Sequence, residues 1–192
     1  MGPDLDDMVR CVQCFRICLA GSLLAVAVGC GPADSRSADS AVMRFEELNF
    51  QFGLPGRLWA ILGPEAFNTD ATLAMRRDQP EVYFMIMAED AGAGLEVDAA
   101  HLAEIVRRNL AAAVGESSVV REYPRRINGL NGIQFATDVK IRGHTLVYQH
   151  WVCSRKGYYY QLFTFGDAAH RAAIGREAER LFTRFSLIDE QQ

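Results

Sequence analysis

The side chains best suited to chemistry are five cysteines, four of which lie within the first 30 residues. Cys11 and Cys14 have the C-x-x-C spacing of many metal and redox sites. They stand at the edge of an apolar export segment rather than after a strand of a folded domain, so we expect neither chemistry from them. Cys153 is the one cysteine in the expected domain. Without a partner it excludes a disulfide framework, and we expect it to pack as a small apolar residue.

The four histidines are the next candidates, as metal ligands. His144 and His150 are six residues apart on a predicted strand and therefore share a face. They would lie roughly 20 Å apart along that strand. Because one metal ion needs ligands that converge, this pair predicts no metal site. His101 and His170 lie within or near predicted helices, and we expect both to face solvent.

Glu89 and Asp90 adjoin at the end of a predicted strand, and paired carboxylates can act as general acid and base. The polar, glycine-rich run that follows them favours a solvated turn. Ser117 and Ser118 lack the strand–turn–helix context of a nucleophile elbow. Neither a phosphate-binding loop nor a dinucleotide fingerprint occurs in the sequence. The sequence therefore predicts a protein that is not an enzyme and that holds no cofactor and no metal.

The charge pattern limits the partners further. The net charge is −4 and no basic stripe occurs, so we expect no nucleic-acid binding. Arg121, Arg125 and Arg126 form a basic, turn-rich stretch that leads into Asn128-Gly129. These arginines could bind anionic headgroups or an acidic partner. A solvated loop is the favoured interpretation.

An aromatic group lies on the last two predicted strands and consists of Trp151, Tyr158, Tyr159 and Tyr160. Strand alternation places Tyr158 and Tyr160 on one face and Tyr159 on the other. One face must pack on a helix, whereas tyrosines on the other could bind a partner, because Tyr and Trp dominate interface hot spots. Core packing is the favoured interpretation. The alternative is a binding patch with six members: Trp151, Tyr158, Tyr160, Arg121, Arg125 and Arg126.

The elements that position these residues follow an uncharged apolar segment, Ile17 to Val28, with Arg10 and Arg16 before it. The segment is too short to cross a bilayer as a helix, which needs about 20 apolar residues. Its length and its positive flank match the core of a signal peptide. The acidic start, Met1 to Asp7, is unusual for such a flank, so Met8 is an alternative start.

The segment ends Ala27-Val28-Gly29-Cys30, which resembles the lipobox of bacterial lipoproteins. The resemblance implies that residues 1–29 are removed and that the Cys30 thiol carries a diacylglycerol. The acylated protein, held in the membrane by its lipid anchor, is then expected in the cell envelope, facing the periplasm. Gly31 stands where aspartate commonly retains lipoproteins at the inner membrane, which slightly favours the outer membrane. The alternative is an ordinary secretory signal with a chance cysteine.

Residues 30–42 form the expected flexible tether, because Gly31 to Ser40 contains no large apolar residue. The folded domain is expected at 43–188. Asp98 is the expected N-cap of a helix at 99–114, with Gly115 as its C-cap. Apolar patterns predict six strands, at 48–53, 72–77, 82–88, 133–141, 145–153 and 158–165. They also predict a second helix at 168–182 and a short extended tail at 185–188. The sequence predicts an α+β fold: an antiparallel sheet of about six strands, including a C-terminal three-stranded meander, packed with two helices.

Several segments of this pattern resemble the Mog1/PsbP-like proteins, including bacterial lipoproteins akin to DcrB and to the mycobacterial LpqN type. The resemblance covers about 43–188 and implies a non-enzymatic domain that binds proteins or stabilises assemblies. It transfers no catalytic residues, because the family has no shared catalytic set. The segments that carry the resemblance are Phe50 to Gly56 with Trp59 nearby, the helix before Gly129 to Gly132, the meander, Gly157 to Tyr160 in its closing hairpin, and Phe185-Ser186.

These observations predict a membrane-anchored envelope lipoprotein that acts as a non-enzymatic binding or accessory protein, with an envelope protein as its partner. Two alternatives stay open. One is an envelope protein that binds a small ligand or a lipid, which needs an apolar pocket. The other is an envelope hydrolase whose site the sequence does not disclose.

Overall fold

The computed structural model describes residues 41–63, 70–92, 97–114 and 116–189. The predicted signal peptide, Cys30, nearly all of the predicted tether and the predicted C-cap Gly115 lie outside these residues. Within the described residues, no helix is long and apolar enough to cross a membrane.

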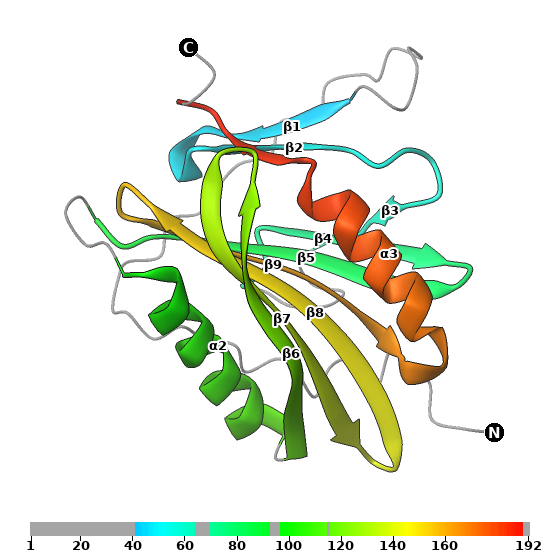
Figure 1. Ribbon diagram of the computed structural model, residues 1–192. Coiled ribbons are helices and arrows are strands. Elements are labelled where there is room, and N and C mark those ends of the chain that lie inside the picture. Colours follow the sequence, from blue (N-terminus) through cyan, green and yellow to red (C-terminus); the bar gives the residue numbers. More distant parts are fainter. Residues whose placement is uncertain (1–40, 64–69, 93–96, 115, 190–192) are drawn as a thin grey trace.

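A seven-stranded antiparallel sheet forms the centre of the domain (Figure 1). Its long strands pair with their neighbours along most of their length, and the outermost positions belong to β3 and β6. In spatial order the strands are β3 (Ala60–Ile61), β4 (Leu73–Asp78), β5 (Glu81–Asp90), β9 (Tyr158–Asp167), β8 (His144–Arg155), β7 (Leu130–Ile141) and β6 (Glu116–Ile127).

A smaller sheet joins the two ends of the domain. Its strands are β1 (Val42–Phe45), β2 (Phe50–Gly53) and β10 (Phe185–Leu187), in the order β1-β2-β10. A 3₁₀ turn, η2 (Glu46–Leu48), connects β1 to β2. Because β10 pairs with β2, the last strand of the domain is fixed to one of the first.

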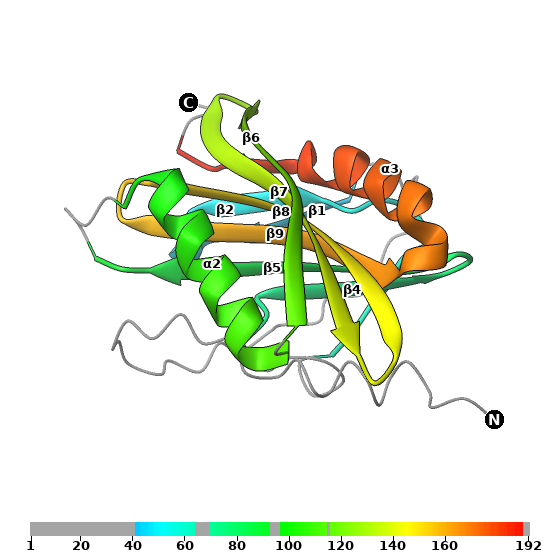
Figure 2. The ribbon, with the colours of Figure 1, turned by 60° about the horizontal axis from the view of Figure 1, so that its bottom comes forward.

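Two helices cover opposite faces of the large sheet, α2 (Ala99–Val114) on one and α3 (Arg171–Phe182) on the other (Figure 2). The predicted N-cap of α2 is confirmed, because Asp98 Oδ1 accepts hydrogen bonds from the backbone N–H of Ala100 at 2.7 Å and of His101 at 3.2 Å. A short 3₁₀ turn, η4 (Ala168–His170), leads into α3.

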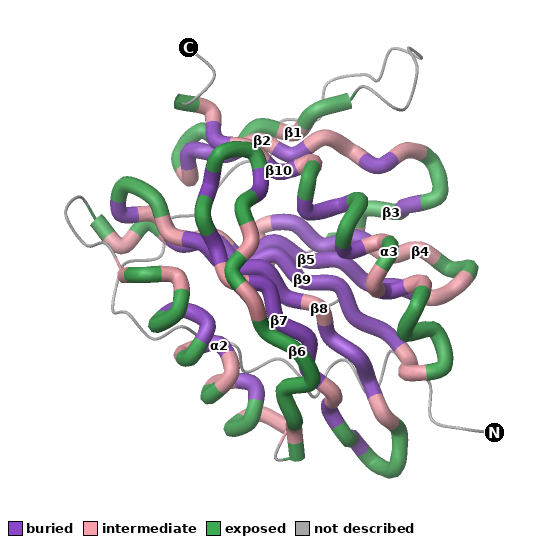
Figure 3. The backbone as a smooth tube through the Cα atoms, viewed as in Figure 1, coloured by how far each residue is buried: buried purple, intermediate pink, exposed green. Residues whose placement is uncertain are grey.

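The large sheet separates two apolar cores. Its central strands are buried along most of their length (Figure 3). One lies under α2 and contains Tyr83, Phe135 and Phe163. The other lies under α3 and the small sheet. Strands in the middle of the sheet are therefore apolar on both faces, as the sequence of β5 predicts.

The predicted α+β class with two helices is confirmed, but the predicted number of strands is wrong. The described residues form ten strands in two sheets rather than about six in one. The six predicted strands correspond to β2, β4, β5, β7, β8 and β9, and the predicted extended tail is β10. The strands β1 and β3, with four and two residues, are too short to show a clear alternation.

The prediction of a solvated loop around Arg121 is wrong, because this stretch is the long strand β6. It forms a hairpin with β7 through Asn128-Gly129, and both turn residues have positive φ, at 45° and 88°. Two positive φ values define the type I′ turn that matches the twist of paired strands. The predicted meander is thus one strand longer, running from β6 to β9.

Candidate functional site

The outer strand β6 is the most exposed of the long strands of the large sheet. It pairs only with β7, and Ile127 is the only buried one of its twelve residues. Val119 and Val120 are 48% and 57% exposed, at a bulge in the pairing with β7. We call Val119, Val120 and Arg121 the β6 edge.

The backbone of β6 is protected against pairing with a further strand. The bulge bends the strand at Val120, and Pro124 has no N–H to donate. Native edge strands use such bulges, prolines and charges to prevent edge-to-edge association. A partner of β6 would therefore contact its side chains rather than extend its sheet.

The three predicted arginines do not converge on one point of the surface. Arg121 lies over the ring of Tyr123, with its guanidinium carbon 4.6 Å from the ring centroid. Arg125 Nη1 donates to Glu179 Oε1 of α3 at 2.7 Å and also to Gln134. Arg126 Nε donates to the carbonyl of Gly129 at 3.2 Å. The charge of Arg125 is thus compensated within the domain, while Arg121 remains at the bulge beside the two valines.

The strand β6 is fixed to both helices. Arg125 connects it to α3, and Arg107 of α2 pairs with Glu122. Arg107 also pairs with Glu104 at 2.7 Å, and its guanidinium carbon lies 5.8 Å from the centroid of the Phe135 ring. The position of the β6 edge is therefore set by contacts on both faces of the sheet.

Trp151 of the predicted patch is completely buried. Its indole Nε1 donates to the carbonyl of Arg125 at 3.2 Å, and its ring lies against Gly132. A Cβ atom on Gly132 would come within 2.6 Å of Trp151 Nε1, so only glycine allows this approach. Trp151 stabilises the core beneath the β6–β7 hairpin and offers no surface to a partner.

Tyr160 is also buried, and its hydroxyl donates to the carbonyl of Leu48 at 2.9 Å. Burial raises the pKa of the Tyr160 hydroxyl, with smaller contributions from nearby Cys153 and Tyr158. Tyr158 is half-buried, with its ring 6.3 Å from that of Tyr160. The favoured core-packing interpretation fits Trp151 and Tyr160. Because both are buried, neither belongs to an exposed binding patch. Cys153 is buried, as predicted, and forms no disulfide within the described residues.

His150, for which the sequence predicts no metal site, is buried and its titration is strongly perturbed. Its ring stacks on those of Phe135 and Phe163, at centroid distances of 4.5 and 5.5 Å. Burial lowers the pKa of His150 to about 3. Its Nδ1 lies 3.4 Å from Gln161 Nε2, and its Nε2 has no hydrogen-bond partner among the described residues. The imidazole is therefore neutral at physiological pH and part of the core.

The other histidines behave as surface residues. His101 and His170 are exposed, as predicted, and His144 is exposed at the start of β8. No group of three or more histidine, cysteine or carboxylate side chains within the described residues could hold a metal ion.

The predicted solvated turn at Glu89 and Asp90 is wrong, because both residues belong to β5 and pair with Tyr159 and Tyr158. Burial raises the pKa of the Glu89 carboxyl, and the charge of Asp70 adds to this effect. The Asp90 carboxylate instead accepts from the backbone N–H of Gly92 at 2.8 Å. Neighbouring residues of a strand point to opposite faces, so the two carboxylates do not form a catalytic pair.

No protein-family model matches the chain, and no curated protein matches it significantly. Solved structures do match. The solution structure of cyanobacterial PsbP (CyanoP) from Synechocystis has a TM-score of 0.62 at 8% identity, over 82% of this chain and 98% of that chain.

Two crystal structures match less closely. LpqN, involved in cell envelope biogenesis of Mycobacterium tuberculosis, has a TM-score of 0.52 at 12% identity, over 72% of this chain and 82% of that chain. A Bacteroides thetaiotaomicron protein also has a TM-score of 0.52 at 12% identity, over 80% of this chain and 50% of that chain. At such identities the likeness concerns the fold alone. The fold of this chain is similar to that of the PsbP-like proteins, as the sequence resemblance predicts.

Proposed function

We propose that this protein is a lipid-anchored accessory protein of the cell envelope, without enzymatic activity, that binds another envelope protein through the β6 edge. The observation that carries the proposal is the exposure of Val119 and Val120 beside Arg121 on the outer strand β6. Ion pairs with both helices hold this strand in place.

The membrane anchor is supported by the sequence. The apolar segment ends in small residues before Cys30, and residue 41 begins the described domain. The eleven residues that lead from Cys30 to Ala41 reach about 40 Å at most when fully extended. An acylated Cys30 would therefore keep the domain close to the membrane surface.

The chemistry of the β6 edge favours a partner with an apolar contact area and an acidic rim. Two valines supply the apolar area, and the Arg121 guanidinium beside them would pair with a carboxylate. Arginine is enriched at interface hot spots, where apolar contacts surround and desolvate it. The similarity in fold to LpqN, a protein of envelope biogenesis, supports a location in the envelope.

The proposal is tested by cross-linking in intact cells, followed by capture of the full-length tagged protein from solubilised membranes. Three variants are compared with the wild type: Cys30→Ala, the double variant Val120→Asp/Arg121→Glu, and Arg176→Glu as a control that reverses an exposed charge on α3. We expect the wild type and Arg176→Glu to yield the same cross-linked protein.

The double variant is expected to remain at the membrane and to lose that protein, whereas Cys30→Ala is expected to leave the membrane fraction. Equal capture by the double variant and the wild type would contradict the binding role of the β6 edge. Unchanged membrane association of Cys30→Ala would contradict the lipid anchor.

A further inference from the structure

Exposed apolar side chains gather at a second place, on the side of the domain where the described chain begins. Of the five large apolar residues that are exposed within the described residues, three lie in the first 21 positions from Ala41: Val42 at 53%, Leu58 at 71% and Ile61 at 52% exposure. Val42 belongs to β1 and Ile61 to β3, and Leu58 lies in the turn that precedes β3. We call Val42, Leu58 and Ile61 the β1–β3 edge.

The strands β1 and β3 lie on the same side of the domain, opposite β6. In the large sheet, β3 and β6 are the two outermost strands. In the small sheet, β10 lies next to the β6–β7 hairpin, because Asn128 Nδ2 donates to the carbonyl of Phe185 at 2.6 Å. β1 is the outermost strand at the other side of the small sheet and therefore lies on the β3 side (Figure 1).

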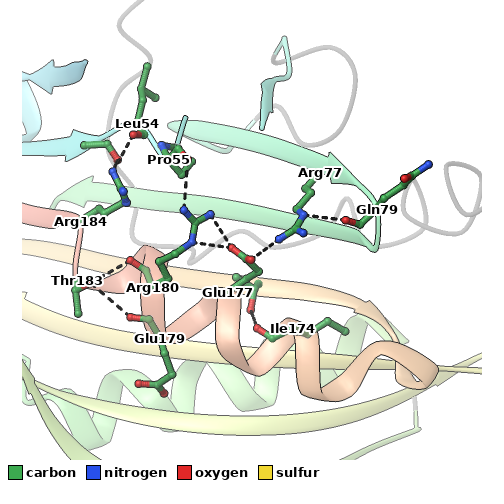
Figure 4. A network of polar contacts seen from close by, with 12 residues as sticks. Leu54, Pro55, Arg77, Gln79, Ile174, Glu177, Glu179, Arg180, Thr183 and Arg184 are labelled. Carbon is green, nitrogen blue, oxygen red and sulfur yellow. Dashed lines mark hydrogen bonds and ion pairs between the residues drawn. The ribbon is translucent and has the colours of Figure 1, made fainter. Parts of the chain in front are cut away.

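The turn that carries Leu58 is firmly held (Figure 4). Arg184 Nη1 donates to the carbonyl of Leu54 at 2.8 Å, and Arg180 Nη1 donates to that of Pro55 at 3.3 Å. Glu177 of α3 positions the Arg180 guanidinium at 2.8 Å. On the other side of the turn, Trp59 is only 7% exposed. The exposure of Leu58 is therefore built into the fold.

The chain enters the domain next to this turn. The carbonyl of Ala41 accepts a hydrogen bond from the backbone N–H of Leu54 at 2.8 Å, four residues before Leu58. The segment from Cys30 to Ala41 thus ends at the β1–β3 edge. Two arginines accompany the apolar residues: Arg57 is exposed, and Arg44 is 54% exposed and lies 3.7 Å from Glu46.

We propose that the β1–β3 edge lies on the bilayer surface, with Leu58 inserted among the acyl chains and Arg57 paired with anionic lipid headgroups. This inference rests on the proposed lipid anchor, which brings this edge to the membrane first. An apolar side chain at the tip of a rigid turn, with a basic residue beside it, has the amphipathic character of interfacial membrane contacts. The β6 edge then faces away from the bilayer, where a protein partner can reach it.

The test uses the acylated protein that begins at Cys30, reconstituted into vesicles of phosphatidylethanolamine and phosphatidylglycerol. Leu58→Cys and, as a control, Val120→Cys each receive an environment-sensitive fluorophore. Cys153 is buried and does not compete for the label. Equal melting temperatures of both labelled proteins and the wild type establish that they are folded.

Both labelled proteins are expected to float with the vesicles. The label at position 58 is expected to lose most of its emission to a quencher carried by the lipid tails, and the label at position 120 to a water-soluble quencher. Replacing phosphatidylglycerol by phosphatidylcholine, or introducing Arg57→Glu, is expected to reduce the lipid quenching at position 58.

Two other results would each have a distinct meaning. If both proteins float but the water-soluble quencher also reaches position 58, the orientation is wrong while the anchor stands. If neither protein floats, the lipid anchor is wrong and the proposed orientation is wrong with it.

Discussion

The β6 edge and the β1–β3 edge are the two exposed apolar regions of the described domain, and they differ in how the fold supports them. Arg107 and Arg125 connect β6 to a helix on each side of the sheet through surface ion pairs. The turn of the β1–β3 edge is held by arginines that donate directly to backbone carbonyls. The first region is a strand with charged side chains, whereas the second is a turn beside the point where the chain enters.

This difference gives the domain two distinguishable sides. Surface valines and leucines are ordinary when they are scattered singly. Here they lie on opposite sides of the domain, and the β1–β3 edge adjoins the segment that leads to Cys30. A protein tethered at one edge can present the other to a partner.

The packing beneath the β6–β7 hairpin is expected to be the most sensitive to change. In Gly132→Ala, the new Cβ would lie 2.5 Å from the Val152 carbonyl oxygen, so the free energy of unfolding should fall by about 3 kcal/mol. Denaturation in urea measures this change. The control is Gly175→Ala on α3, where no atom lies within 4 Å and helix propensity should add up to about 1 kcal/mol. Equal effects of the two variants would contradict the close packing of Trp151 on Gly132.

The core between the two edges should make stability depend on pH. The pKa of His150 is lowered from 6.5 to about 3 by burial, so the folded state resists protonation that the unfolded state accepts. The contribution is complete above pH 6.5 and is lost as the pH falls towards 3. Between pH 7 and pH 5 we expect the free energy of unfolding to fall by about 2 kcal/mol. His150→Gln should remove most of this slope, and an unchanged slope would contradict the lowered pKa of the buried imidazole.

The supports of the two edges should differ in strength. Arg184→Ala removes the donor to the carbonyls of Gly53 and Leu54, which should cost about 1–2 kcal/mol and speed hydrogen exchange in the turn. Glu122→Ala removes an ion pair whose side chains are 22% and 36% exposed, and should cost less than about 1 kcal/mol. Denaturation of both variants under the same conditions makes the comparison. A larger loss of stability in Glu122→Ala than in Arg184→Ala would contradict the view that the β1–β3 edge is held more firmly than the β6 edge.

The exposed apolar side chains themselves should contribute little to stability. Leu58→Ser and Val120→Ser are each expected to change the free energy of unfolding by less than about 0.5 kcal/mol. Thermal denaturation measures the change. A loss of several times this size at either position would mean that the side chain packs within the fold, and would remove it from the proposed contact surface.

The sequence was most informative where local signals and burial agree. The bounds of α2 and its Asp98 cap were predicted correctly, because one residue supplies the cap and the apolar face repeats with the helical period. Strand β5 is predicted because it is apolar on both faces, and β8 and β9 are predicted because short turns at Gly143 and Lys156-Gly157 separate their apolar runs. The strand β6 was missed, since an edge that is exposed on both faces has no apolar alternation. The Asn128-Gly129 hairpin signal was present, but the arginines before it favoured a loop.

Contacts between distant segments account for the rest. The small sheet depends on pairing between Gln51 and Ser186, which are 135 positions apart. The ion pair between Arg125 of β6 and Glu179 of α3 also joins segments that are far apart in the sequence. The sequence places Arg121 directly after Val119 and Val120, but only the tertiary structure shows that both valines are exposed and that Arg125 pairs with Glu179. The burial of His150 likewise depends on the helix that covers its face of the sheet.

The most direct test of the two-sided account is photo-cross-linking in living cells that carry the protein with a photoreactive amino acid at position 58 or at position 120. We expect position 120 to give one discrete protein adduct, and position 58 to give phospholipid adducts instead. A protein adduct at position 58, or phospholipid adducts at position 120, would contradict the assignment of one edge to the membrane and the other to a partner.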